Sequence, residues 1–239
     1  MIELHDFSTG YGDKTLFARV NADIASGELT ALIGRNGSGK STLLRAMAGL
    51  NYNYSGEITV DNCGIKQMPA SVLARKLAFV GTQRTRIANL TCAQLVGLGR
   101  APYTDWIGRL SKKDKDAVAD ALKATGMSAY ADRPLTTMSD GECQRVMVAR
   151  AVAQDTPVIL LDEPTSFLDL PNRYELCLLL RRLAHERGKC ILFSTHELEI
   201  AMRMCDRIAV VDNQGLKIMP PDSIKASGIL ERLFLIQSI

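Results

Sequence analysis

The clearest chemical pattern in the sequence is the segment GRNGSGKST, residues 34–42. It fits the spacing G-x-x-x-x-G-K-[ST], in which glycines let the backbone wrap around a phosphate whose charge faces the N–H groups of the loop. Lys40 would reach the β- and γ-phosphates of a nucleotide, and Ser41 would hold Mg²⁺. An ordinary glycine-rich turn is disfavoured, since the apolar run LTALI precedes the loop and a helical pattern follows it. We therefore predict a nucleotide site made of Gly34, Asn36, Gly37, Ser38, Gly39, Lys40, Ser41 and Thr42.

A pair of acids forms the second candidate group, in the segment VILLDEPTS, residues 158–166. Asp162 would bind the magnesium shell, and Glu163 would polarise a water molecule for in-line attack on the γ-phosphate. Alone, an Asp-Glu pair after an apolar strand more often begins a polar loop. With a phosphate-binding loop in the same chain, the pair predicts hydrolysis of a nucleoside triphosphate.

A second anion-binding helix start is predicted in the segment MSDGECQRV, residues 138–146. The free N–H groups at the start of a helix attract anions. The first phosphate-binding loop lies about a hundred residues earlier in the chain. The segment also carries two acids, Asp140 and Glu142, which would repel a phosphate that faced them directly.

Apolar runs predict the strands that must position these groups. Uninterrupted runs at 158–161, 190–194 and 208–211 are typical of parallel strands covered on both faces. Further strands are expected at 29–33, 57–60 and 77–80. Residues 2–24 alternate as in antiparallel strands, broken by the turn STGYGDK.

Between Thr91 and about Asp155 helical spacing replaces the strand pattern. The expected fold class is therefore α/β: a parallel sheet core, a small antiparallel N-terminal β-subdomain and a helical subdomain. The expected organisation is one domain over residues 1–239. Its nucleotide-binding core comprises 1–83 and 156–239, and its helical subdomain comprises 84–155.

Composition excludes several other classes of protein. The 239 residues are 46% hydrophobic and 23% charged with a net charge of +3, which is ordinary for a soluble globular protein and argues against nucleic-acid binding. No apolar run approaches the roughly 18 residues of a membrane span, and no signal peptide is expected. None of the six cysteines is in a CxxC pair, so reduced structural thiols are expected. The alternating charges predict a solvated helix face at Lys112, Lys113, Asp114, Lys115 and Asp116.

The chain resembles the nucleotide-binding ATPase subunit of ABC transporters, over essentially its whole length. The resemblance depends on an ordered set of motifs rather than on any one of them. These are GRNGSGKST, then GTQ with Gln83, MSDGECQ, VILLDEP, FLD with Asp169, and STHE with His196. The resemblance implies a P-loop NTPase fold, with ATP and Mg²⁺ as cofactors.

The same resemblance implies roles for individual residues. Tyr11 matches the adenine-stacking aromatic, although alone it would be read as a turn residue. Gln83 matches a residue that contacts Mg²⁺ or the attacking water, and His196 a residue that contacts the γ-phosphate. Together with Lys40 and Glu163 these two form the expected catalytic set, and the expected metal set is Ser41, Gln83 and Asp162.

In this family two subunits pack head to tail. The helix that begins at the family's signature motif, here MSDGECQ, caps the γ-phosphate that the other subunit binds. This arrangement explains two anion-binding helix starts in one chain. The residues expected to act on the partner's nucleotide are Ser139, Gly141, Glu142 and Asp169. We expect the Ser139 hydroxyl and the Gly141 N–H to touch the phosphate and Asp140 to point away from it. Asp169 has a second interpretation as an ordinary helix N-cap, and both can hold.

Within the family the chain resembles importer subunits for iron-siderophores, haem or cobalamin, on the segments LVGLGRAPYTDW, SDGE and DEPTSFLDLPNR. This subgroup implies a transmembrane permease dimer as partner, a substrate-binding protein as an indirect one, and a place on the cytoplasmic face of the cell membrane. Trp106 is expected to pack in the helical subdomain. Alternatives are an exporter subunit, a non-hydrolysing regulatory subunit, and a soluble ABC ATPase of DNA repair or translation.

Overall fold

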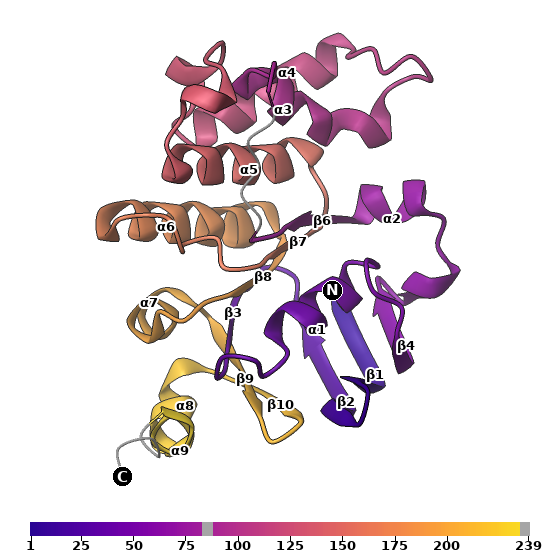
Figure 1. Cartoon of the computed structure of the whole chain (residues 1–239), viewed down its shortest axis with the longest axis vertical. Coiled ribbons are helices and arrows are strands. Elements are labelled where there is room, and N and C mark those ends of the chain that lie inside the picture. The colour runs from indigo at the N-terminus through magenta and orange to yellow at the C-terminus, as the bar shows by residue number, and fades with distance from the viewer. Residues whose placement is uncertain (83–87, 235–239) are drawn as a thin grey trace.

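A twisted sheet crosses the middle of the molecule (Figure 1). The computed structural model describes residues 1–82 and 88–234, so Gln83 lies outside the described residues. Within them, six strands form this sheet in the order β10-β9-β3-β8-β7-β6. All neighbouring pairs are parallel except β10 with β9. The strands are β3 (Leu29–Ile33), β6 (Leu77–Val80), β7 (Val158–Leu161), β8 (Cys190–Ser194), β9 (Arg207–Asp212) and β10 (Gly215–Met219).

Alternating side chains of the parallel strands enter two different cores. In β7, Ile159 and Leu161 face one core, while Val158 and Leu160 face the other. The same alternation holds in β8, where Phe193 and Leu192 lie on opposite faces. Burial on both faces is the physical reason for the uninterrupted apolar runs, and it confirms the prediction made from them.

A second sheet lies beside the first and covers one side of it (Figure 1). It is antiparallel, with the order β2-β1-β4-β5. Its strands are β1 (Ile2–Tyr11), β2 (Lys14–Ile24), β4 (Tyr54–Val60) and β5 (Cys63–Gly64). The break expected over all of STGYGDK was too wide. β1 continues to Tyr11 and β2 begins at Lys14, so only Gly12 and Asp13 connect the two strands. Gly12 adopts a left-handed backbone with φ of 53°, which a tight turn of this kind requires.

Helices connect the strands and build the part at the top of Figure 1. That part contains α3 (Cys92–Gly97), α4 (Lys112–Ala124) and α5 (Asp140–Gln154), and all three contribute to one apolar core. The subdomain boundaries at 84 and 155 stay a prediction. The remaining helices are α1 (Lys40–Met47), α2 (Ala70–Lys76), α6 (Leu170–Arg187), α7 (Leu198–Met204), α8 (Pro221–Ala226) and α9 (Ile229–Phe234). None of the helices in the described residues is long and apolar enough to cross a bilayer.

The cysteines behave as the sequence predicts. All six are free, and only Cys63 is exposed. Burial raises the pKa of Cys177 to about 12 and that of Cys190 to about 11. Such thiols carry little thiolate at neutral pH and act as small apolar side chains.

The solvated helix face predicted at residues 112–116 is wrong for Asp114. This side chain is buried, with 4% of its surface exposed. Its carboxylate accepts hydrogen bonds from the N–H and hydroxyl of Ser111, which caps α4, and from Arg100 Nε at 2.9 Å. The Ser111 hydroxyl, supported by the Arg100 guanidinium, holds the pKa of Asp114 below its usual range despite burial. Charge alternation could not reveal this contact, because Arg100 lies outside the helix.

Trp106 also departs from its expected packing. It lies in the segment that connects the short helical turn at residues 98–103 with α4, and 93% of its surface is exposed. Ile107 beside it is 52% exposed. Neither side chain contributes to the core of the helical part.

Asp114→Asn is expected to lower the free energy of unfolding by about 3 kcal/mol, because it leaves the buried Arg100 charge without its anionic partner. Urea denaturation followed by circular dichroism measures the change. Asp116→Asn is the matched control, since Asp116 lies on the same helix and is exposed. Equal stability of the two variants would show that the Arg100–Asp114 pair does not hold the helical part together.

Candidate functional site

The loop at residues 34–39 lies between the end of β3 and the first residue of α1. Gly37 and Gly39 have φ values of 72° and 101°, in the region that favours glycine. A Cβ at Gly39 would also lie only 2.9 Å from Cε2 of Phe17. The fold therefore requires glycine where the loop turns into α1.

Lys40 is buried inside this loop, with 6% of its surface exposed. Its Nζ donates to the carbonyl oxygens of Gly34 at 2.9 Å and Arg35 at 3.2 Å. Burial lowers the pKa of Lys40, while the nearby carboxylates of Glu163 and Asp162 act in the opposite direction. Ser38 Oγ is buried with no hydrogen-bond partner among the described residues. A buried cation and an unsatisfied hydroxyl in a turn of N–H groups fit a nucleotide phosphate.

Asp162 follows the last residue of β7 and is 1% exposed. Its Oδ1 accepts from Ser41 Oγ at 3.1 Å and from Ser194 Oγ at 2.7 Å. The hydroxyl and the carboxylate are oxygen ligands of the kind that Mg²⁺ prefers, directly or through water. The two predicted metal residues that the structure describes, Ser41 and Asp162, are therefore adjacent. The third, Gln83, lies outside the described residues.

Glu163 and His196 meet at the same edge of the sheet. Glu163 follows Asp162, and His196 follows the end of β8. His196 Nε2 lies 2.8 Å from Glu163 Oε1. Glu163 has a φ of 50°, which is uncommon for a non-glycine residue, and its N–H donates to Ser194 Oγ at 2.8 Å. Since both side chains are partly exposed, this pair can reach a water molecule and a bound phosphate.

Tyr11 lies at the end of β1, with 58% of its surface exposed. Its hydroxyl is 3.3 Å from Thr42 Oγ1 in the first turn of α1. The ring is thus beside the phosphate loop and open to a flat ligand. Its role in stacking on adenine stays a prediction.

The predicted second helix start is real, and it is held by its own side chains. Ser139 caps α5: its Oγ accepts from the N–H of Glu142, and Glu142 accepts from the N–H of Ser139 at 2.7 Å. Arg133 adds an ion pair to Glu142 at 3.0 Å. The Ser139 N–H, supported by the Ser139 hydroxyl and Arg133, holds the pKa of Glu142 below its usual range. Glu142 thus organises the helix start through hydrogen bonds with Ser139.

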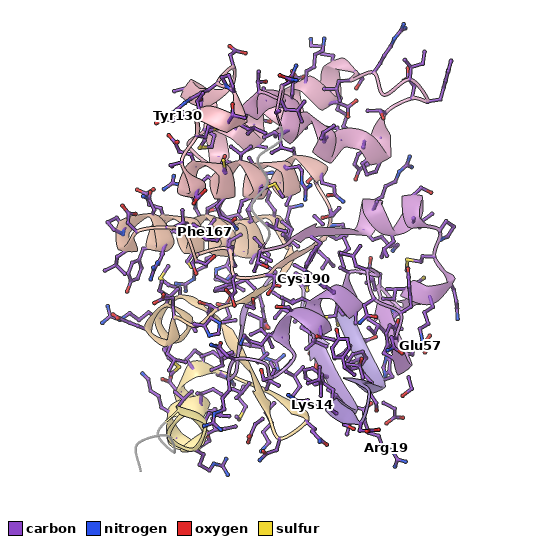
Figure 2. The ribbon with its side chains drawn as sticks, in the orientation of Figure 1. Lys14, Arg19, Glu57, Tyr130, Phe167 and Cys190 are labelled. Carbon is purple, nitrogen blue, oxygen red and sulfur yellow. The ribbon has the colours of Figure 1, made fainter. Side chains whose placement is uncertain are left out.

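A cavity of about 530 Å³ lies in front of this helix start. Ser139 and Gly141 line it on one side, and Phe167, Leu168 and Asp169 on the other. Figure 2 shows Phe167 at the level of α6, below Tyr130, which also lines the cavity. Among the described residues, the lining includes none from the phosphate loop of the same chain. The two predicted anion sites are therefore separate within one subunit.

Asp169 is the N-cap of α6, and its Oδ1 accepts from the N–H of Asn172 at 3.1 Å. The capping interpretation is correct. The role across a subunit interface stays a prediction, although Asp169 does line the cavity with Ser139 and Gly141.

Two residues of the site were missed from the sequence. Ser194 joins Asp162 to Glu163, and the available signal was a polar residue at the end of an otherwise apolar strand. Arg145 of α5 donates to Asn172 and to Glu175 of α6, the latter at 2.8 Å. No sequence signal indicated that pairing, because the partners are about thirty positions apart.

Comparison with known proteins agrees with this geometry. A family model described as ABC transporter matches residues 17–166. The iron(3+)-hydroxamate import ATP-binding protein of Bacillus subtilis is 36% identical over 223 residues, which cover 90% of this chain and 83% of that protein. A solved structure, the inward-facing conformation assigned to a metal-chelate type ABC transporter, has a TM-score of 0.85 and 27% identity, covering 98% of this chain and 88% of that one. The dimeric cassette MJ0796 bound to ADP and Pi has a TM-score of 0.82 and 27% identity, covering 92% and 99%.

Proposed function

The chain belongs to the ABC transporter ATP-binding family, and we propose that it is the ATP-hydrolysing subunit of an importer for an iron-siderophore or a related metal chelate. One observation carries the proposal. The carboxyl ends of β3, β7 and β8 bring together Lys40, Asp162 and the Glu163–His196 pair. In a parallel sheet this edge is where ligands bind.

The proposed roles of the residues follow from their contacts. The loop N–H groups, Ser38 and Lys40 would bind the phosphates of ATP, and Ser41 and Asp162 would hold Mg²⁺, which would supply positive charge against the phosphates. Glu163 accepts a proton from the attacking water. The Nε2–H of His196, 2.8 Å from Glu163 Oε1, fixes the carboxylate, and a contact of His196 with the γ-phosphate would use this N–H in place of the carboxylate bond. Tyr11 supports the adenine.

The functional unit is proposed to be a head-to-tail dimer with two copies of ATP between the subunits. The separation of the Ser139 cavity from the phosphate loop supports this, because a helix start that faces no nucleotide of its own can face that of a second copy. A related cassette forms a dimer with ADP and Pi bound. Such an interface is isologous, so each site takes one part from each subunit.

The subunit is proposed to act on the cytoplasmic face of the membrane, bound to a permease dimer that receives its ligand from a binding protein. The named activities of related proteins support a ferric chelate as the cargo.

Deleting the gene in its own organism should reduce uptake of ⁵⁵Fe presented as a hydroxamate or catecholate chelate. The wild-type gene, but not the Lys40→Ala variant, should restore it. Unchanged uptake of both chelates would overturn the cargo assignment.

Lys40→Ala is expected to weaken ATP binding by at least about 10-fold, since a charge-assisted contact to the phosphates is lost. Equilibrium binding of a fluorescent ATP analogue measures it. Lys217→Ala, at an exposed lysine in β10, is the control and should bind as wild type. Unchanged affinity in Lys40→Ala would remove this lysine from the nucleotide site.

A further inference from the structure

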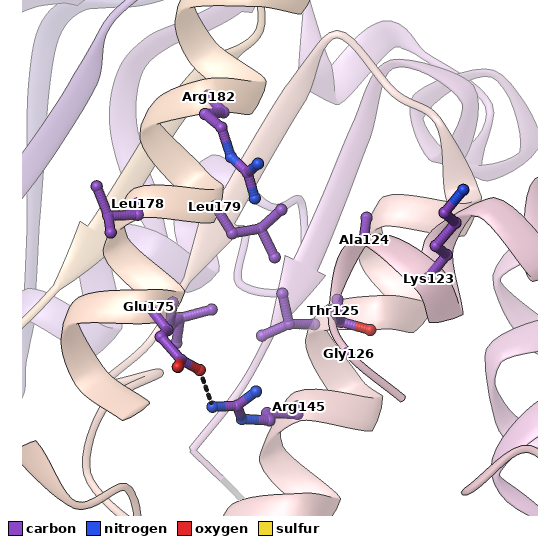
Figure 3. Close-up of a pocket in the computed structure, with 11 residues that line it drawn as sticks. Lys123, Ala124, Thr125, Gly126, Arg145, Glu175, Leu178, Leu179 and Arg182 are labelled. Carbon is purple, nitrogen blue, oxygen red and sulfur yellow. Dashed lines mark hydrogen bonds and ion pairs between the residues drawn. The ribbon is translucent and has the colours of Figure 1, made fainter. Parts of the chain in front are cut away.

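A second cleft, of about 480 Å³, lies between the end of α4, α5 and α6 (Figure 3). It is distinct from the nucleotide site, since among the described residues none of the phosphate loop lines it. Its walls are mostly apolar. Val148, Leu176 and Leu179 are buried in them, and Ala124 is partly buried. The volume is in the range of small-molecule sites, which are typically apolar with a few polar groups.

The polar groups of the cleft are mainly cationic. Lys123, Arg145 and Arg182 line it together with a single carboxylate, Glu175, so its net charge is +2. Arg145 is paired with Glu175 at 2.8 Å. The side chains of Lys123 and Arg182 form no hydrogen bond or ion pair among the described residues. Arg182 extends from α6 over Leu179 toward the space in front of α4, and Lys123 lies at the opposite rim (Figure 3).

The cleft shares a wall with the Ser139 cavity, the space lined by Ser139, Gly141 and Asp169. Gly126 and Arg145 line both spaces. Arg145 also holds Asn172 and Glu175, in the first turns of the helix that Asp169 caps. A molecule in the cleft would therefore touch α4 and α5 on one side and α6 on the other, and would fix the position of Ser139 relative to Asp169.

We propose that this cleft is a regulatory site for a small amphipathic organic anion, with an aromatic or aliphatic body against Leu176 and Leu179 and its acidic group at Arg182. Charge complementarity selects the anion, since two cations at the rim lack partners among the described residues. A bound anion bridges α5 and α6. It thereby changes how the Ser139 cavity packs against the second subunit, and this changes the rate of ATP hydrolysis. The change in rate rests on the proposed function, whereas binding itself does not.

Two probes with the same aromatic body test the site. 8-Anilinonaphthalene-1-sulfonate carries an acidic group, and N-phenyl-1-naphthylamine does not. Titrations use the folded full chain with a saturating non-hydrolysable ATP analogue, so that the nucleotide site is filled. We expect one saturable anilinonaphthalene sulfonate site per chain, binding at least about 10-fold more tightly than the neutral probe.

Three variants locate the binding. Arg182→Glu reverses the rim charge, and Ala124→Phe fills the cleft without changing charge. Each should weaken binding of the anionic probe at least 10-fold, while Arg187→Glu, at an exposed residue further along α6 that does not line the cleft, should leave it unchanged. Thermal denaturation confirms that each variant is folded. Unchanged affinity in both cleft variants, or equal affinity for the two probes, would overturn the site.

Hydrolysis is measured separately. Saturating anionic probe should change the ATPase rate of the wild type at least twofold and leave that of Ala124→Phe unchanged. Binding in the cleft with no change in the wild-type rate would overturn the regulatory role. If the wild type hydrolyses no ATP but still binds the probe as described, the proposed function fails and the site stands.

Discussion

Glu163→Gln is expected to lower steady-state ATP turnover by about 10²-fold or more while ATP still binds. The amide keeps the shape of the side chain but cannot accept a proton from water. Glu163 is the carboxylate that both follows Asp162, the proposed magnesium ligand, and contacts His196, at 2.8 Å. The phosphate loop and Lys40 are untouched, so nucleotide affinity should remain.

The variant should also accumulate as an ATP-bound dimer, because hydrolysis is the step proposed to release the two subunits. Size-exclusion chromatography with ATP and Mg²⁺ measures the dimer, and phosphate release measures turnover. Glu199→Gln, at an exposed residue of α7, is the control and should hydrolyse ATP normally. Hydrolysis at the wild-type rate in Glu163→Gln would assign the base to another residue.

The site could be predicted from the sequence because its residues follow strand ends. Once 29–33, 158–161 and 190–194 are identified as parallel strands, their carboxyl ends must share one edge of the sheet, and Lys40, Asp162 and His196 must be neighbours. Buried strands leave a strong local pattern, so both the fold class and this edge could be inferred without coordinates.

The errors concern contacts between residues that are distant in the chain. Asp114 looked like part of a solvated charge run, yet it is buried, completes the capping box with Ser111 and binds Arg100, fourteen positions earlier. Trp106 looked like a core residue, yet it lies exposed outside any regular helix. Residue type and spacing report the face of a helix or strand, but they do not report which side chain from another element will meet it.

Glu142, in the segment MSDGECQRV, has partners within its own subunit, and its role on the partner's nucleotide stays a prediction. From the sequence alone, Glu142 was expected to act on the partner's nucleotide. In the structure its carboxylate is engaged by the Ser139 N–H and by Arg133. The Glu142 carboxylate completes the capping box with Ser139, and its negative charge suits the positive end of α5. Glu142 therefore stabilises the first turn of this helix. An anion in this cavity would then meet Ser139 and Gly141 first.

Gly141→Asp is expected to lower the rate of ATP hydrolysis by about 10²-fold or more, without affecting ATP binding to the isolated subunit. A Cβ at this position would lie 3.2 Å from the Phe167 carbonyl oxygen and 3.3 Å from Leu168 Cδ2. The new carboxylate would enter the cavity where the partner's γ-phosphate is proposed to lie. Ser128→Asp, which adds the same charge at an exposed position of the helical part, should remain active.

Mixing two inactive variants decides whether the signature serves its own subunit or the other one. A heterodimer of Lys40→Ala and Gly141→Asp subunits contains one site in which both faults meet and one site in which neither is present. Random mixing should therefore restore about a quarter of the wild-type rate, because half of the dimers are mixed and each holds one intact site. If each signature acted within its own chain, every site would carry one fault and the mixture would stay inactive. Since the Ser139 cavity contains no described residue of its own phosphate loop, we expect activity to return.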